Sequence, residues 1–141
     1  MPVARSDIVA EARTWIGTPW RHQRCVKAVG VDCGQLIAGV LRELGVRDVV
    51  ITGYARIPDG SLRGICEQHM KAVPVSQAQP GDAVLMRFDT EPQHLGILGD
   101  YPHGGLSLIH STLKNRKVVE HRLDDRWRNY CVAAYSILEA P

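Results

Sequence analysis

A cysteine at the start of a predicted helix is the residue of this chain best suited to covalent chemistry. Cys33 follows Asp32, a residue type that caps helix N-termini, and Gln35 lies where it can complete a capping box. The partial positive charge of a helix N-terminus favours the thiolate over the thiol. Cys33 is therefore a candidate nucleophile, and the alternative is a buried cysteine that happens to begin a helix.

A nucleophilic thiol needs a base, and the base needs a third group that orients its ring. His94 and His110 are the candidates, because each lies in a short β-prone run. The period of two puts His94 on one face with Gly96, and His110 on one face with Leu108. If these strands pair, both imidazoles can project from the same side of a sheet. The alternative for each is a polar residue at a strand end.

The remaining histidines have weaker claims. His22 lies in the loop before Cys33 and can line the same cleft. We expect a solvated or structural role for His69, His103 and His121. The basic residues near the C-terminal hairpin are interleaved with acidic ones, which favours a solvated face over a site for an anionic polymer; they are Lys114, Arg116, Lys117, Arg122, Arg126 and Arg128.

The elements that must position these side chains follow from the apolar spacing. Three helices are predicted, from Ser6 to Trp15 with Ser6 or Asp7 as cap, from Cys33 to a stop at Gly45, and from Leu62 to Met70. The segment from Gly53 to Gly60 is rich in turn residues. Five short β-prone runs follow Pro80: 83–88, 94–98, 106–110, 118–123 and 132–137. Helices first and strands afterwards predict an α+β fold, with N-terminal helices packed on an antiparallel sheet of about five strands.

Length and charge bound the function. The chain has 141 residues and 45% hydrophobic content, so we expect one domain, spanning residues 1–141. Its net charge of +2 argues against a nucleic-acid partner. The N-terminal segment is interrupted by charged residues and no apolar run reaches the length of a membrane span. We therefore expect synthesis in the cytoplasm without a signal peptide, and no membrane insertion.

Four cysteines at wide spacing contain no C-x-x-C pair. In a reducing compartment such thiols are reduced, and Cys25, Cys66 and Cys131 are expected to fill the core, although a disulfide stays open. An alternative is a zinc site, since His22 and Cys25 form an H-x-x-C pair that Cys33 and a further histidine could join. No second closely spaced ligand pair appears, so we expect no metal.

Four segments together resemble the NlpC-type family of cell-wall cysteine peptidases, which has a compact papain-like fold. They are Gly17-Thr18-Pro19-Trp20, then Gly30-Val31-Asp32-Cys33 with Leu36, then Gln79-Pro80-Gly81-Asp82, and last His94-Leu95-Gly96-Ile97 with Leu108-Ile109-His110-Ser111. Segment 20–23 and segment 39–44 are also similar to the small members found in prophages and gene transfer agents, which are associated with phage tails.

The resemblance implies a hydrolase with a Cys33, His94, His110 triad that needs no cofactor. Cys33 would attack an amide carbonyl, His94 would be general base and acid, and His110 would orient His94. The substrate would be the peptidoglycan stem peptide, cut between D-glutamate and a diamino acid. The partners would be that peptide and phage-tail proteins, and the place of action would be the cell wall, reached on a virion or tail.

Departures from the family pattern concern the substrate-binding positions, for which we name Asp32, Gly34, Trp20 and His22. Gly34 stands where the family usually has Ser, and Trp20 where it usually has Tyr; His22 and Gln23 replace a pair of glycines. These departures bear on substrate specificity rather than on the triad. Two further functions stay open: a catalytically inactive structural tail-assembly domain of the same fold, and acyl transfer or deamidation by the same triad.

Overall fold

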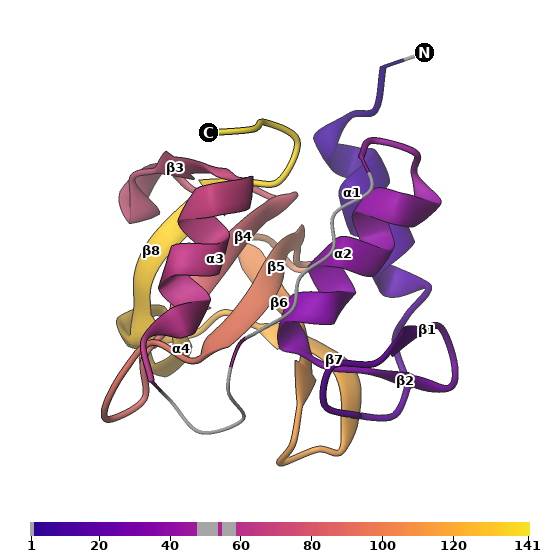
Figure 1. Ribbon diagram of the computed structural model, residues 1–141. Helices are drawn as coiled ribbons and strands as arrows, with labels where there is room; N and C mark the ends of the chain where they lie inside the picture. Colours follow the sequence, from indigo (N-terminus) through magenta and orange to yellow (C-terminus); the bar gives the residue numbers. More distant parts are fainter. Residues whose placement is uncertain (1, 48–53, 55–58) are drawn as a thin grey trace.

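The computed structural model describes residues 2–47, 54 and 59–141 (Figure 1). Its helices are α1 (Arg5–Arg13), α2 (Cys33–Glu43), α3 (Ser61–His69) and α4 (Asp125–Tyr130), with a 3-10 turn at Val75–Gln77. Its strands are β1 (Cys25–Val26), β2 (Gly30–Val31), β3 (Lys71–Val73), β4 (Asp82–Met86), β5 (His94–Asp100), β6 (Leu106–Thr112), β7 (Lys117–Arg122) and β8 (Cys131–Ser136). The turn-rich segment 53–60 falls mostly outside the described residues.

The main sheet has six antiparallel strands in the order β3-β8-β4-β5-β6-β7. This confirms the α+β fold and all five predicted strands, and corrects their number. The additional strand, β3, has only three residues and is followed by Pro74, so it carries no period that sequence reasoning can detect. A separate hairpin of β1 and β2 precedes α2.

Two apolar clusters lie on the two faces of the sheet. On one face α1 and α2 pack against β5, α2 also contacts β6, and α3 adds Leu62 and Cys66 to the same core. In Figure 1, α2 and α3 lie in front of the sheet. On the other face Met86, Leu98 and Leu108 are covered by Trp127 and Tyr130 of α4. None of the described helices has the length and apolar character of a membrane span.

The N-terminal caps of α1 and α2 can be compared with those predicted from the sequence. Asp32 caps α2 as predicted, and its side chain accepts from the Gln35 N–H at 3.0 Å. The cap of α1 is Ala4 rather than Ser6 or Asp7; Asp7 lies one turn in and accepts from the Ala4 N–H at 2.8 Å. The predicted residue thus stabilises the helix start from its third position.

The segment from Gln79 to Asp82 joins the first helix to the sheet. The buried Asp82 carboxylate accepts from the Arg5 guanidinium and from the Gln79 N–H. Gly81 has a φ of +92°, and a Cβ there would lie 2.9 Å from the Arg5 carbonyl oxygen. Only glycine fits this close approach without strain.

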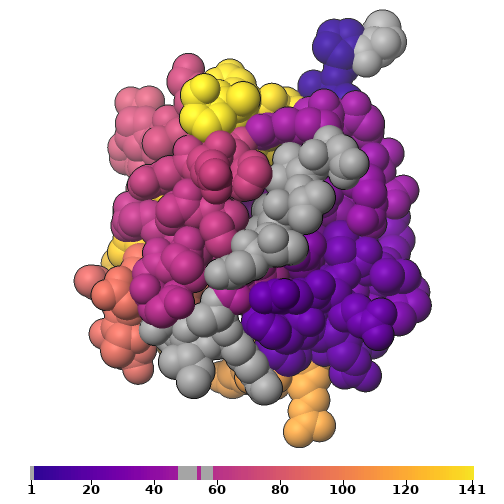
Figure 2. Space-filling view, viewed as in Figure 1, coloured from indigo at the N-terminus to yellow at the C-terminus, as the bar shows by residue number. Residues whose placement is uncertain are grey.

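At the opposite end of the molecule, the tip of the β6–β7 hairpin projects from the surface, in orange in Figure 2.

Two helical glycines make a matched test of the packing. A Cβ on Gly39 in α2 would lie 2.6 Å from the Trp15 ring, whereas a Cβ on Gly64 in α3 would meet nothing within 4 Å. We expect Gly39→Ala to lower the free energy of unfolding by about 1–3 kcal/mol through overpacking. Gly64→Ala should raise it by about 0.5–1 kcal/mol. Urea unfolding measures both, and equal effects would contradict the packing of Trp15 on α2.

Candidate active site

A cavity of about 400 Å³ opens at the N-terminal end of α2, and Cys33 and His94 both line it. Its wall is largely aromatic and apolar, with the two cations Lys114 and Arg126. The other lining residues are Trp20, His22, Asp32, Tyr54, Asp59, Ser61, Leu62, Phe88, Pro92, Gln93, Ser111, Thr112, Leu113, Trp127 and Tyr130.

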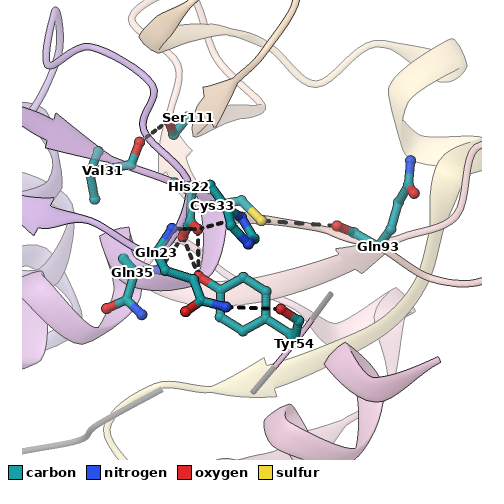
Figure 3. A network of polar contacts seen from close by, with 9 residues as sticks. His22, Gln23, Val31, Cys33, Gln35, Tyr54, Gln93 and Ser111 are labelled. Carbon is teal, nitrogen blue, oxygen red and sulfur yellow. Dashed lines mark hydrogen bonds and ion pairs between the residues drawn. The ribbon is translucent and has the colours of Figure 1, made fainter. Parts of the chain in front are cut away.

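Cys33 is held at this cavity by its neighbours on both sides. The thiol donates toward the carbonyl oxygen of Gln93, at 4.0 Å, and Gln93 immediately precedes His94 (Figure 3). On the other side the Ser111 hydroxyl of β6 donates to the Val31 carbonyl at 2.8 Å. This contact fixes the chain two residues before Cys33 against the strand that carries His110. All four cysteines are free.

The buried carboxylate of Asp32 gathers the residues around the start of α2 (Figure 3). It accepts from the Gln35 N–H, from the Gln23 N–H at 2.5 Å, and from the Tyr54 hydroxyl at 2.6 and 2.5 Å. Since a buried carboxylate needs such donors, Asp32 binds the preceding loop and Tyr54 to the helix. Its role is structural as well as cavity-lining.

The resting thiol of Cys33 is neutral. Burial raises its pKa to about 12, and the Asp32 carboxylate beside it adds to the shift. The helix N-terminus therefore does not yield the thiolate expected from the sequence, because desolvation and a neighbouring negative charge outweigh the helix dipole. A reaction in which this sulfur attacks a substrate would therefore have to remove the thiol proton during the attack.

His94 and His110 project from the same face of the sheet, as predicted, with His94 Nε2 at 2.6 Å from His110 Nδ1. The register pairs Ile97 with Ile109, so His110 lies opposite Gly96 and two residues from His94. A Cβ on Gly96 would lie 3.3 Å from the His110 Cβ and 2.4 Å from Leu108. The glycine thus leaves room for the diagonal contact of the two rings. Five residues join the two seven-residue strands.

Both imidazoles are neutral at neutral pH. Burial lowers the pKa of His94 to about 4, with a smaller contribution from His121. Burial lowers the pKa of His110 to about 2, and repulsion from His94 and His121 adds to it. A neutral His94 is able to accept a proton, as a general base must.

Of the solvated or structural role expected for His121, the structure supports the structural one, because its Nε2 lies 2.8 Å from Nε2 of His110. Its Nδ1 lies 2.9 Å from the Arg122 carbonyl oxygen. Trp127 covers both rings, with centroid distances of 5.1 Å to His110 and 4.9 Å to His121. The sequence does not reveal this contact, because the neighbours of His121 are charged. The contact depends on the register of β6 and β7, which places His121 beside His110.

Of the predicted substrate-binding residues, Trp20, His22 and Asp32 line the cavity and Gly34 does not. Gly34 is buried, and a Cβ there would touch the Tyr54 ring at 3.6 Å. Sequence reasoning missed the aromatic residues that line the wall, Tyr54, Phe88, Trp127 and Tyr130. No local signal marks them, because their elements are far apart in the sequence.

His22 and Cys25, the pair considered as zinc ligands, contact different partners. His22 Nδ1 lies 3.7 Å from Asp32 Oδ2, while the Cys25 thiol donates to the Gln35 carbonyl at 3.2 Å. Within residues 2–47, 54 and 59–141, no three His, Cys, Asp or Glu side chains are grouped to hold a metal ion.

Two aspartate caps test the special role of Asp32. Asp32→Asn keeps a good cap but turns an amide N–H₂ toward the donors of Gln23 and Tyr54, so we expect a loss of about 1–3 kcal/mol in the free energy of unfolding. Asp124 caps α4 at an exposed position through the Trp127 N–H. Asp124→Asn should change stability by less than about 0.5 kcal/mol. Chemical unfolding of both variants measures the difference, and similar losses would contradict this account of Asp32.

The buried imidazoles make stability depend on pH. Because the folded pKa values lie below 6.5, the unfolded chain binds protons below that pH that the folded chain does not. The stabilisation is complete above pH 6.5 and falls as pH drops toward the folded pKa of about 4, by up to about 1.4 kcal/mol per pH unit for each imidazole.

His110→Asn removes one of these groups and keeps an oxygen acceptor for His94. The slope of unfolding free energy against pH, measured between about pH 6 and pH 5, should therefore fall by about half. His103→Asn, at an exposed turn, is the control for loss of an imidazole. An unchanged slope in His110→Asn would show that His110 is not held neutral in the fold.

Comparison with known proteins identifies the family of the chain. The family model described as the NlpC/P60 family matches residues 17–136. The structure is similar to the NlpC/p60 domain of the peptidoglycan hydrolase SagA, with 26% identity, a TM-score of 0.69, and 95% of this chain and 99% of that chain covered. No curated protein matches the chain significantly.

Two further structures share the fold. An NlpC/P60 family protein from Bacillus cereus ATCC 10987 has 20% identity and a TM-score of 0.72, over 99% of this chain and 42% of that chain. An N-acetylmuramoyl-L-alanine amidase from Bacteroides uniformis ATCC 8492 has 13% identity and a TM-score of 0.58, over 93% and 96%. The family model spans most of this chain. The chain therefore belongs to the NlpC/P60 family, a family of hydrolases.

Proposed function

We propose that this protein is a cysteine peptidase or amidase that cleaves peptidoglycan stem peptides, with Cys33 as nucleophile, His94 as general base and acid, and His110 as the residue that orients His94. The observation that carries the proposal is the 2.6 Å contact of His94 and His110 at the wall of the cavity that Cys33 lines. The order nucleophile, base, orienting group is the arrangement that covalent amide hydrolysis needs.

The neutral resting state defines the first chemical step. As the Cys33 sulfur forms a bond to the carbonyl carbon of the substrate, His94 takes the thiol proton. The oxyanion that forms is stabilised by the Cys33 backbone N–H at the N-terminus of α2. His94 then gives the proton to the departing amine as the C–N bond breaks. Water, deprotonated by His94, hydrolyses the thioester and releases the thiol.

The cavity suits a peptide that carries carboxylates. Its aromatic wall can pack on the aliphatic parts of a stem peptide, and Lys114 and Arg126 can pair with its carboxylates. The names of two similar structures, a peptidoglycan hydrolase and an N-acetylmuramoyl-L-alanine amidase, support the same substrate class. Within it we propose the bond between D-glutamate and a diamino acid.

We further propose that a phage or prophage tail carries the domain to the cell wall, on the likeness of segments 20–23 and 39–44 to small tail-associated members. The rival is an inactive tail-assembly domain of the same fold. The intact set of Cys33, His94 and His110, with its hydrogen bond, favours the active enzyme.

The test is release of soluble muropeptides from purified sacculi, read by chromatography and mass spectrometry. We expect the wild-type chain to release fragments that end at the D-glutamyl bond. Cys33→Ala should lose the activity, by on the order of 10⁶-fold if the nucleophile matters as it does in serine peptidases. Cys25→Ala, which changes a cysteine outside the cavity lining, is the matched control and should keep it.

Two results would contradict the proposal. Release by folded Cys33→Ala at the wild-type rate would exclude Cys33 as nucleophile. No release by folded wild-type protein from sacculi of several wall types would favour the structural role.

A further inference from the structure

Three histidines form a continuous row across three neighbouring strands. His94 of β5 contacts His110 of β6 at 2.6 Å, and His110 contacts His121 of β7 at 2.8 Å. The same offset of two residues recurs at both steps, since His121 lies opposite Leu108 in the register and His110 opposite Val119. We call His94, His110 and His121 the imidazole row.

The row ends at a backbone carbonyl that fixes the direction of its hydrogen bonds. The Arg122 carbonyl can only accept, so the His121 nitrogen facing it, Nδ1, carries the proton. In the neutral ring Nε2 then accepts, and His110 must donate from Nε2. His110 therefore presents a lone pair at Nδ1, to which His94 donates from Nε2. The lone pair of His94 is left on Nδ1.

We infer that His121 is a positioning residue that sets the tautomer of His110, and through it leaves His94 with the lone pair that a general base requires. The inference rests on the proposed function for its kinetic consequence, but the tautomers themselves are independent of any substrate. A carboxylate in the third position could only accept; an imidazole there has two neutral tautomers, so it needs a further group to select one.

The alternative tautomer shows why this selection matters. If His110 carried its proton on Nδ1, that proton would point at His94 Nε2 and force His94 to carry its own proton on Nδ1. His94 would then have no free lone pair for a thiol proton. The wrong tautomer of a catalytic imidazole costs about 10⁴-fold in kcat where the orienting group contacts it directly.

The variant His121→Phe separates hydrogen bonding from packing. Phenylalanine can keep the ring contacts with Trp127 and His110 but has no nitrogen for His110 Nε2. His121→Gln is the conservative variant, because its amide oxygen can accept from His110. His103→Phe at an exposed turn is the control.

The direct test is long-range ¹H–¹⁵N correlation NMR of histidine-labelled protein at neutral pH, which distinguishes the two neutral tautomers of each ring. In the wild type we expect the proton on Nδ1 of His121 and on Nε2 of His110 and His94. In His121→Phe, His110 should become a mixture of tautomers, and in His121→Gln and His103→Phe it should keep the Nε2 proton. A wild-type His121 with its proton on Nε2, or an unchanged His110 in His121→Phe, would overturn the inference.

The kinetic test compares kcat and KM on sacculi-derived peptides. We expect kcat of His121→Phe to fall about tenfold or more with KM nearly unchanged, and His121→Gln to recover most of the loss, since a group one step from the catalytic base affects orientation rather than binding. The rate of alkylation of Cys33 by iodoacetamide, followed on the Cys33 peptide by mass spectrometry, should fall in the same order. An equal kcat in all variants would overturn the inference. Inactive wild-type protein with the expected NMR pattern would instead count against the proposed function alone.

Discussion

The buried carboxylate of Asp32 is the constraint on which the arrangement of the site depends. It caps α2 through the Gln35 N–H, holds the preceding loop through the Gln23 N–H, and accepts from the Tyr54 hydroxyl beside it at the cavity wall. A buried charge that loses a donor becomes costly, so these segments are fixed together. The position of Cys33, the next residue, follows from that fixation. The same negative charge also raises the pKa of the thiol, so the group that places the proposed nucleophile also keeps it protonated.

The sheet fixes the positions of the histidines, as Asp32 fixes the position of Cys33. Antiparallel pairing places residues two apart on neighbouring strands at a separation that two imidazoles can bridge, and Gly96 leaves the space for the first bridge. Trp127 of α4 packs on the rings of His110 and His121. Burial lowers the pKa values of His94 and His110, and repulsion from His121 adds to both shifts, so neutral rings and directed hydrogen bonds occur in the same structure. Precision here comes from strand register rather than from loops.

Much of this could be predicted from the sequence because the relevant signals are local. The cap at Asp32, the apolar stripe after Cys33 and the period of two around His94 each lie within one element, and the structure confirms them. The strand β3 and the helix α4 were missed because three residues, or the charged run at 125–130, carry no apolar period. Tyr54 and His121 were missed for another reason. Their importance depends on which distant segment each one meets, and a single sequence holds no record of that.

The neutral states of the thiol and of the imidazoles have a common physical origin and a common consequence. Each group is removed from water, which penalises its charged form, and within the described part of the chain no positive charge acts on Cys33 to offset that penalty. A charged thiolate and imidazolium would be stabilised only when a further dipole or charge arrives. In the proposed reaction a substrate carbonyl provides this, because the bond to sulfur disperses the negative charge onto an oxygen that faces the Cys33 backbone N–H and the helix dipole. In the proposed reaction, charge separation therefore occurs together with attack on the substrate, and the imidazole row is the part of the structure that would direct the proton.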